Sequence, residues 1–431
     1  MELPAFWESP AERILTVLSA PEGGALVYNT KSSSPYREKF VKTSLPPLAF
    51  DSKSKVKKAR WDRYRLLSVV RKIMNTKGNE AGLEYSANYH RTAKCNLVAV
   101  KHTVDVHQSV EHGKAFYSGL SVCGDVWNCP VCSAKIQERR RVEVSNAVDW
   151  AYKNGYKCIM VTFTMPHTIF NRLDGLLDSQ KDAFVKLRSG KAWSNYTSDI
   201  GFEGLIRSLE HTYGFENGWH PHTHELWIVD RSADVSEMRE FIVNRWYNSC
   251  VKSGVTISNK DAFFQHSVDI VDNASNSDYL AKMDSEKHWG IDRELVKGNS
   301  KNGLHPFGIL ERIYQGETDL INLFLEYSEA VKGKRQLFWS HGLKKKVGIA
   351  DQTDQEIAEK TEDDAFLVAS LSLEDWKVIT RNNLQSELLD ITEEMGIEGI
   401  KLLLKRWRDV PPEDEILPLK SIAEGGYRED W

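Results

Sequence analysis

The sequence predicts an α+β protein with a mostly antiparallel sheet, a Cys-rich zinc-binding segment and a helical C-terminal extension. Between residues 158 and 283 the apolar patterns follow the order strand, helix, hairpin, helix, strand, helix, which is typical of this fold class. Four of the six cysteines are grouped between residues 95 and 132. From residue 365 to residue 410 the apolar residues recur with a helical period, which predicts the C-terminal helices.

Local signals place the individual elements. Residues 158–165 are apolar and β-branched and lie between Gly155 and Pro166, so we expect a central strand there. Asn217-Gly218 is a hairpin turn signal that joins two further strands. Along the chain we expect strands at 158–165, 204–214, 220–229 and 263–271, and helices at 53–72, 133–154, 170–188 and 236–250, followed by a short helix that carries Tyr279.

Length and composition limit the organisation of the chain. With 431 residues, of which 41% are hydrophobic, two to four domains are expected. We predict an N-terminal extension with a basic helix (1–85), a zinc-binding segment with a second basic helix (86–155), the main α+β domain (156–350), and an acidic linker, helical module and tail (351–431). In the last part a capping signal begins at Ser372, and Gly396 and Gly399 interrupt the helical run.

Charge and hydropathy indicate the compartment and the partners. The net charge of −4 excludes a polycation, so any nucleic-acid contact must use local basic patches. No signal peptide and no run of 18 apolar residues is present, so we expect a cytoplasmic protein without a membrane partner. Residues 53–72 carry nine Lys or Arg against one acid. Solvated helix faces are the alternative to DNA contact for the candidate residues, which are Lys57, Lys58, Arg60, Arg139, Arg140 and Arg141.

The cysteines predict a structural zinc site. Cys129-Pro-Val-Cys132 is a knuckle whose two thiolates can reach one tetrahedral zinc ion, and Cys123 lies just before it. Cys95 is the expected fourth ligand. His90, His102 and His107 are the other candidates for that position, and a disulfide or free thiols are the alternatives to zinc. Cys158 and Cys250 stand alone in apolar surroundings and are expected to be ordinary buried thiols.

Three alternating histidines predict a second metal site. In an extended strand His220, His222 and His224 project from one face. If Asn217-Gly218 forms the tight loop, Glu210 on the preceding strand falls beside them. Imidazole and carboxylate together favour Mg²⁺ or Mn²⁺. The alternative for Glu210 is a surface acid, and His220 is a fourth ligand, a phosphate contact or a group that orients the ligands.

Tyr279 and Lys282 are the candidate catalytic side chains. They lie three residues apart at the start of a predicted helix, so they share one face. A metal site with open positions serves either hydrolysis by water or transesterification by a side chain such as the Tyr279 phenol. Ordinary packing is the alternative, since the chain has 15 tyrosines.

An ordered set of motifs resembles the replication initiators of rolling-circle plasmids, within the HUH endonuclease superfamily. The likeness covers roughly residues 86–350 and includes the cysteine knuckle. The other matching pieces are Val161-Thr-Phe-Thr-Met-Pro-His167, Glu210-His-Thr-Tyr213, Gly218-Trp-His-Pro-His-Thr-His224, Tyr279-Leu-Ala-Lys282, Glu294-Leu-Val-Lys297, His305-Pro-Phe307 and Trp339-Ser-His-Gly-Leu343.

The resemblance implies a fold and an activity. It implies a ferredoxin-like or RRM-like antiparallel sheet and an endonuclease that nicks and rejoins single-stranded DNA at an origin hairpin. Tyr279 would form a 5′-phosphotyrosine link, and His222, His224 and Glu210 would bind the metal. Host helicase and DNA polymerase are the implied partners, and a second copy of the chain is another. A transposase or relaxase, a metal-dependent phosphoesterase and a non-catalytic zinc-dependent DNA-binding regulator are the competing functions.

The sequence departs from the family pattern at one point. Many relatives have a second Tyr or Glu four positions from the nucleophile, where this chain has Ser275 and Met283. The residue that ends the replication cycle is therefore unassigned. The candidates for activating water are Asp278, Asp284 and Glu286, and a Tyr279 from a second copy is the alternative.

Overall fold

The computed structural model describes residues 55–80, 90–272, 303–360 and 364–408. Its helices are α2 (Lys55–Glu80), α3 (Arg91–Lys94), α4 (Pro130–Lys153), α5 (Leu173–Leu187), α6 (Lys191–Asp199), α7 (Val235–Lys252), α8 (Lys260–His266), α12 (Pro306–Tyr314), η1 (Thr318–Leu320), α13 (Ile321–Ala330), α14 (Leu343–Val347), α15 (Asp354–Glu359), α16 (Leu373–Arg381) and α17 (Gln385–Trp407). Its strands are β1 (Thr103–Ser109), β2 (Ala115–Ser118), β3 (Tyr156–Phe163), β4 (Gly204–Gly214), β5 (Gly218–Asp230), β6 (Val268–Val271), β7 (Leu337–Trp339) and β8 (Ala365–Ser372). In these ranges, none of the helices has the length and apolar character needed to cross a bilayer.

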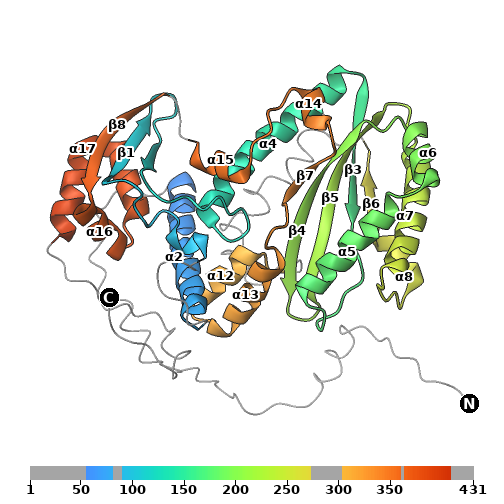
Figure 1. Ribbon diagram of the computed structural model, residues 1–431, viewed down its shortest axis with the longest axis horizontal. Coiled ribbons are helices and arrows are strands. Elements are labelled where there is room, and N and C mark those ends of the chain that lie inside the picture. The colour runs from blue at the N-terminus through green and yellow to red at the C-terminus, as the bar shows by residue number, and fades with distance from the viewer. Residues whose placement is uncertain (1–54, 81–89, 273–302, 361–363, 409–431) are drawn as a thin grey trace, which may run out of the picture. The chain divides into compact units, whose positions relative to one another are not determined.

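A five-stranded sheet forms the centre of the α+β part (Figure 1). Its strand order is β6-β3-β5-β4-β7, and every neighbouring pair is antiparallel. The prediction of an α+β protein with an antiparallel sheet is therefore confirmed. One face packs on α4 and α14 through side chains such as Val148 and Leu226, and the other packs on α5 and α7 through side chains such as Trp227 and Trp246. Because both faces are covered, β3 and the second half of β5 are almost continuously apolar.

The β4–β5 hairpin has the register that the Asn217-Gly218 turn predicts. Gly214 pairs with Gly218, and the ladder continues to the pair formed by Gly204 and Ile228. Gly218 has a φ of 79°, and a Cβ there would lie 2.8 Å from the Cα of Ile169. Only glycine fits this backbone, so the turn holds the β3–α5 loop close to the start of β5.

A second core joins the cysteine segment to helices from distant parts of the chain. Apolar residues of α2, α12, α13 and α15 pack with the buried cysteines in a single cluster. A separate three-stranded antiparallel sheet has the order β2-β1-β8, and α16 and α17 pack against it. The predicted cap at Ser372 is present, since its hydroxyl accepts from the Asp375 amide at 3.1 Å. Gly396 has non-helical dihedrals and interrupts α17, as predicted.

The structure corrects three element assignments. Residues 365–372, expected to be helical, form strand β8, because β1 offers a free edge that overrides the local periodicity. The expected strand at 263–271 is divided into α8 and the short β6, since the Asn259 side chain caps a helix by accepting from the Ala262 amide. The segment expected to be a linker contains α15, which begins with a capping box between Thr353 and Glu356.

Candidate metal sites

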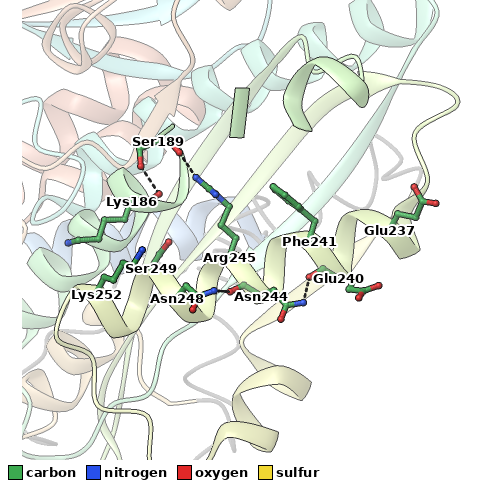
Figure 2. A pocket seen from close by; sticks show the side chains of 10 residues that line it. All are labelled: Lys186, Ser189, Glu237, Glu240, Phe241, Asn244, Arg245, Asn248, Ser249 and Lys252. Atoms are coloured by element: carbon green, nitrogen blue, oxygen red, sulfur yellow. Dashed lines mark hydrogen bonds between the residues drawn. The ribbon is translucent and has the colours of Figure 1, made fainter. Parts of the chain in front are cut away.

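A surface pocket of about 970 Å³ lies between α5 and α7, and none of the predicted site residues lines it (Figure 2). Arg245 projects into it and donates to the carbonyl oxygens of Leu187 and Ser189 at the end of α5. These are the carbonyls that a helix leaves without internal partners, so the guanidinium caps the helix. The side chains around it include both acids and bases, among them Lys186 and Glu237. We assign this pocket a structural role.

Glu210, His222 and His224 converge on one face of the five-stranded sheet. Glu210 pairs directly opposite His222 in the β4–β5 ladder. Its Oε2 lies 3.2 Å from Nε2 of His222 and 3.2 Å from Nε2 of His224. All three side chains keep some exposure, so the site opens to solvent. Among the described residues, these three carry ligand atoms that lie within 4.8 Å of one another.

Hydrogen bonds on the far side of each ring direct the Nε2 atoms toward Glu210. Nδ1 of His222 lies 3.3 Å from the carbonyl oxygen of His220, and a carbonyl only accepts, so Nδ1 carries the proton. In the neutral tautomer the Nε2 lone pair then faces a carboxylate oxygen. Nδ1 of His224 lies 3.0 Å from the hydroxyl of Thr162 on β3, which fixes the second ring. Where an Nε2 lone pair faces a carboxylate oxygen, a cation or an added proton must lie between them.

The geometry and charge of this site fit a divalent cation. In octahedral coordination with metal–ligand distances near 2.1 Å, neighbouring ligand atoms lie about 3 Å apart, which matches the 3.2 Å contacts. Burial raises the pKa of Glu210, but hydrogen bonds and attraction from His222 and His224 outweigh this effect and hold the pKa well below its ordinary value. The carboxylate is therefore ionised and available as a ligand.

His220 points to a different neighbour. Its Nδ1 lies 3.4 Å from the ring of His167, and the two rings meet edge to face at 4.6 Å. Burial, with repulsion from His222 and His167, lowers the pKa of His220 to about 4. His220 is therefore neutral and lies outside the group of close ligand atoms formed by Glu210, His222 and His224, and its role as a fourth ligand, a phosphate contact or an orienting group stays a prediction.

Tyr279 and Lys282 lie outside the described residues, as do Asp278, Asp284 and Glu286. The described residues on either side of that segment belong to different parts of the sheet. Asp272 follows β6 at one edge, whereas Leu304 pairs with Tyr213 near the hairpin end of β4.

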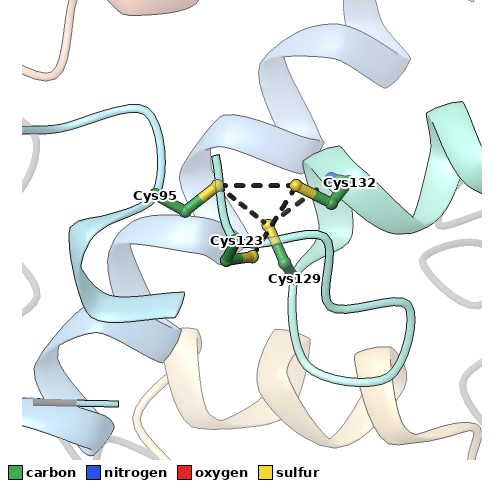
Figure 3. A group of neighbouring side chains, drawn as sticks. All are labelled: Cys95, Cys123, Cys129 and Cys132. Atoms are coloured by element: carbon green, nitrogen blue, oxygen red, sulfur yellow. Dashed lines mark hydrogen bonds between the residues drawn. The ribbon is translucent and has the colours of Figure 1, made fainter. Parts of the chain in front are cut away.

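The four clustered cysteines form a compact tetrahedral group (Figure 3). The Sγ atom of Cys95 lies 3.5 Å from that of Cys132 and 3.7 Å from that of Cys129, and Cys123 lies 3.7 Å from Cys132. With Zn–S bonds of about 2.3 Å, the sulfurs of a zinc tetrahedron lie about 3.8 Å apart. A disulfide needs about 2.05 Å, and all six cysteines are free. The group therefore fits a zinc ion.

Nearby donors suit a cluster of thiolates. The Cys129 sulfur caps α4 by accepting from the Cys132 amide at 3.4 Å, and the Cys123 sulfur accepts from the Asp125 amide at 3.4 Å. Burial and the neighbouring thiols raise the pKa of Cys129, so the thiolates would need a cation. The buried guanidinium of Arg71 on α2 donates to the Cys95 carbonyl at 2.5 Å, which places a positive charge beside the group.

The other candidates for the fourth zinc position lie elsewhere. His90 caps α3 through Nδ1, and His107 stacks on Phe116 and contacts the Ser118 hydroxyl at 2.9 Å. His102 is exposed before β1. Burial raises the pKa of Cys158 and Cys250 to about 12, as expected for ordinary buried thiols.

Two of the three predicted DNA-contact residues of α2, Lys57 and Arg60, face the C-terminal helix instead of open solvent. Arg60 is buried and pairs with Asp390 at 2.6 Å and with Glu393, and Lys57 pairs with Glu394. Lys58 is exposed on the same helix. The sequence could not reveal these acidic partners, which lie more than 300 residues away. The DNA contact of all three stays a prediction.

The three arginines of α4 are also held within the protein. Arg140 pairs with Glu143 at 2.9 Å and with Asp354 of α15 at 3.1 Å. Arg139 lies 3.8 Å from Glu143, and Arg141 pairs with Glu138 at 2.6 Å. Arg139 and Arg141 keep more exposure than Arg140, so they are the members of this group that a DNA phosphate reaches most easily. Their contact with DNA also stays a prediction.

Two neighbours of the histidine site did not emerge from the residue patterns. Thr162 pairs opposite His224, and His167 follows β3 in the loop that the hairpin turn contacts. Both lie in the Val161–His167 motif. The signal that could have found Thr162 is its place on a strand that runs beside the histidine strand, where cross-strand neighbours share one face.

Comparison with known proteins adds the family. The family model described as replication protein matches residues 120–381, more than half of the chain. The chain is similar to "Protein rep" of Streptomyces lividans, with 26% identity over 348 residues that cover 64% of this chain and 76% of that protein. It is also similar to a "Neomycin resistance protein" of Streptomyces cyanogenus, with 34% identity over 142 residues that cover 27% of this chain and 32% of that protein. No solved structure matches the chain. The chain therefore belongs to the replication protein family, which confirms the resemblance to plasmid replication initiators.

Proposed function

We propose that this protein nicks and rejoins single-stranded DNA at a plasmid origin by metal-dependent transesterification, on a sheet of the HUH endonuclease type. The observation that carries the proposal is the convergence of Glu210, His222 and His224 at a solvent-accessible position on the sheet. A ligand group with free positions and a solvent path suits a phosphate oxygen better than a buried structural ion. Mg²⁺ or Mn²⁺ fits the mixed nitrogen and oxygen donors.

The proposed reaction exchanges one phosphodiester for another. The Tyr279 phenol oxygen forms a bond to the scissile phosphorus, and the bond from phosphorus to the 3′-oxygen breaks. The phenol proton leaves to solvent, and the 3′-oxygen takes up a proton, so the products are a 5′-phosphotyrosine and a free 3′-hydroxyl. The metal, when bound, would polarise the phosphate. Lys282, three residues from Tyr279, would lower the cost of forming the phenolate.

The four cysteines would hold a structural zinc ion in this proposal. A Cys₄ site has no open position, so it supports folding and not chemistry. The partners that follow are single-stranded DNA at an origin hairpin, the host helicase and the host DNA polymerase, with a second copy of the chain as a further partner. In this proposal, a second nucleophile or a water molecule carries out the reaction that ends the replication cycle.

The test of the metal site compares His224→Ala with His112→Ala. His112 is an exposed histidine beside β1, far along the chain from the site. Nicking of a single-stranded origin oligonucleotide should fall by at least about 100-fold in His224→Ala, because one ligand and its bond to Thr162 are lost. His112→Ala should cut at the wild-type rate, and EDTA should stop both the wild type and this control. Undiminished cutting in EDTA would defeat the proposal.

An exposed aromatic residue near the site supports a single-stranded substrate. Phe170 is 91% exposed and follows His167, whose ring contacts His220, by three residues. Its Cα therefore lies at most about 11 Å from that of His167. Bases stack on such side chains, each contributing about 1–3 kcal/mol.

Phe170→Ala should accordingly weaken the binding of single-stranded DNA by roughly 5- to 150-fold in fluorescence anisotropy measurements. Nicking at saturating DNA should change much less, because the ligand group is untouched. Phe366→Ala removes an exposed phenylalanine of β8 and serves as the control, with unchanged affinity expected. Equal affinity in wild type and Phe170→Ala would exclude Phe170 as a stacking residue.

A further inference from the structure

An aromatic cluster fills the space behind the histidine site. The Trp127 ring lies 5.2 Å from that of His211, and His211 lies 6.0 Å from Tyr327. Tyr327 stacks on Trp219 at 5.9 Å with an interplanar angle of 23°. All four residues are buried. They come from the cysteine segment, β4, α13 and β5, so the cluster joins the two candidate metal sites.

Trp127 belongs to the loop between two of the cysteines. The carboxylate of Asp125 accepts from the Trp127 amide at 2.9 Å and from the Asn128 amide at 3.0 Å, which forms a tight turn. The indole N–H donates to the Lys334 carbonyl at 2.8 Å, and the Tyr327 hydroxyl donates to the Trp127 carbonyl at 3.4 Å. With Cys123 and Cys129 on either side, the position of this indole depends on the cysteine group.

The far side of the cluster belongs to the strands that carry the metal ligands. His211 directly follows Glu210 on β4, and Trp219 directly precedes His220 on β5. Since successive side chains of a strand point to opposite faces, His211 and Trp219 lie on the reverse of the face that presents Glu210 and His222. Nε2 of His211 has no hydrogen-bond partner among the described residues, so ring packing holds this side chain in place.

We propose that Trp127 is a positioning residue through which the geometry of the histidine site depends on the folding of the cysteine site. By packing on His211 and, through Tyr327, on Trp219, the indole supports β4 and β5 from the reverse face at the point where Glu210 meets His222. The 3.2 Å contacts between ligand atoms then depend on a loop that zinc would order. This inference rests on the proposed function, because it assumes that Glu210, His222 and His224 bind a divalent cation.

The test replaces Trp127 with leucine and uses Trp376→Leu as a matched control. Trp376 on α16 is also buried, and its indole N–H also donates to a backbone carbonyl, that of Leu97 at 2.7 Å. Zinc content is measured by elemental analysis, and Mn²⁺ binding is measured by calorimetry and by the electron paramagnetic resonance of the bound ion. Trp127→Leu should bind Mn²⁺ about 10-fold more weakly while it keeps its zinc. Trp376→Leu should keep wild-type affinity for Mn²⁺.

A second substitution keeps the test decisive if Trp127→Leu does not fold. Trp127→Phe retains a ring beside His211 but loses the N–H bond to Lys334 and part of the indole surface, so its Mn²⁺ affinity should lie between those of the wild type and the leucine variant. Wild-type affinity in both Trp127 variants would overturn the inference, as would an equal loss in Trp376→Leu. If the wild-type protein bound no Mn²⁺ at the histidines, the proposed function itself would fail, and the two failures are thereby distinguished.

Discussion

Tyr279→Phe should yield no covalent protein–DNA adduct. The wild-type protein, incubated with a single-stranded origin oligonucleotide and Mn²⁺, should give an SDS-stable band in which one peptide carries the DNA fragment on the 3′ side of the nick, joined through its 5′-phosphate. Phenylalanine lacks the phenol oxygen that would form the bond to phosphorus, so both the band and the nicking should be lost, by about 1,000-fold or more. Mass spectrometry of the attached peptide identifies the nucleophile directly.

Two comparisons make this result interpretable. Tyr314→Phe changes a partly exposed tyrosine of α12 that contacts Arg65, and its adduct should form as in the wild type. Divalent-cation affinity should be unchanged in Tyr279→Phe, since the ligands Glu210, His222 and His224 are intact. Persistence of the adduct in Tyr279→Phe would move the nucleophile to another residue, whereas cutting without any adduct would favour hydrolysis by water.

Cys129→Ser should remove zinc and most of the stability of the cysteine segment. Cys129 is both a member of the tetrahedral group and the residue whose side chain caps α4, so its loss affects two elements. Structural zinc contributes about 10–16 kcal/mol to folding in small zinc-finger peptides, which is comparable to the usual stability of a whole domain, about 5–15 kcal/mol. We expect less than one tenth of the wild-type zinc content and a thermal transition that is lowered or lost.

Cys250→Ala supplies the matched control for this prediction. Cys250 is fully buried on α7 but lies outside the cysteine group, so this variant should keep its zinc and lose only a modest part of its stability. An unchanged zinc content in Cys129→Ser, or the absence of zinc from wild-type protein purified without chelators, would contradict the assignment of the cysteines to zinc.

The parts of the structure that the sequence predicts well are those set by local chemistry. The alternation of His220, His222 and His224 places them on one face because a strand repeats every two residues, and the Asn217-Gly218 turn fixes the register that brings Glu210 opposite His222. The cysteine spacing similarly predicts a group whose fourth member, Cys95, lies 28 residues before Cys123.

The parts that the sequence could not predict depend on partners far along the chain. Residues 365–372 have a helical period, but they form a strand because they pair with β1. The basic residues of α2, taken alone, are typical of a DNA contact. In the folded protein, however, Arg60 pairs with Asp390 and Glu393 of α17. Thr162 and Trp127 gain their roles only through tertiary packing against His224 and His211, and neither has a local pattern that distinguishes it.

The pairing of β1 with β8 also bears on synthesis in the cell. β1 ends at Ser109 and its neighbour β8 begins at Ala365, so the ribosome must add the intervening residues before the small sheet can close. At roughly 5–20 residues per second, this takes on the order of ten to fifty seconds. Throughout that time one side of β1 presents unpaired amide and carbonyl groups, which remain open until β8 has been synthesised. A message that is cut short before codon 365 therefore yields a product whose β1 edge stays open and prone to aggregation.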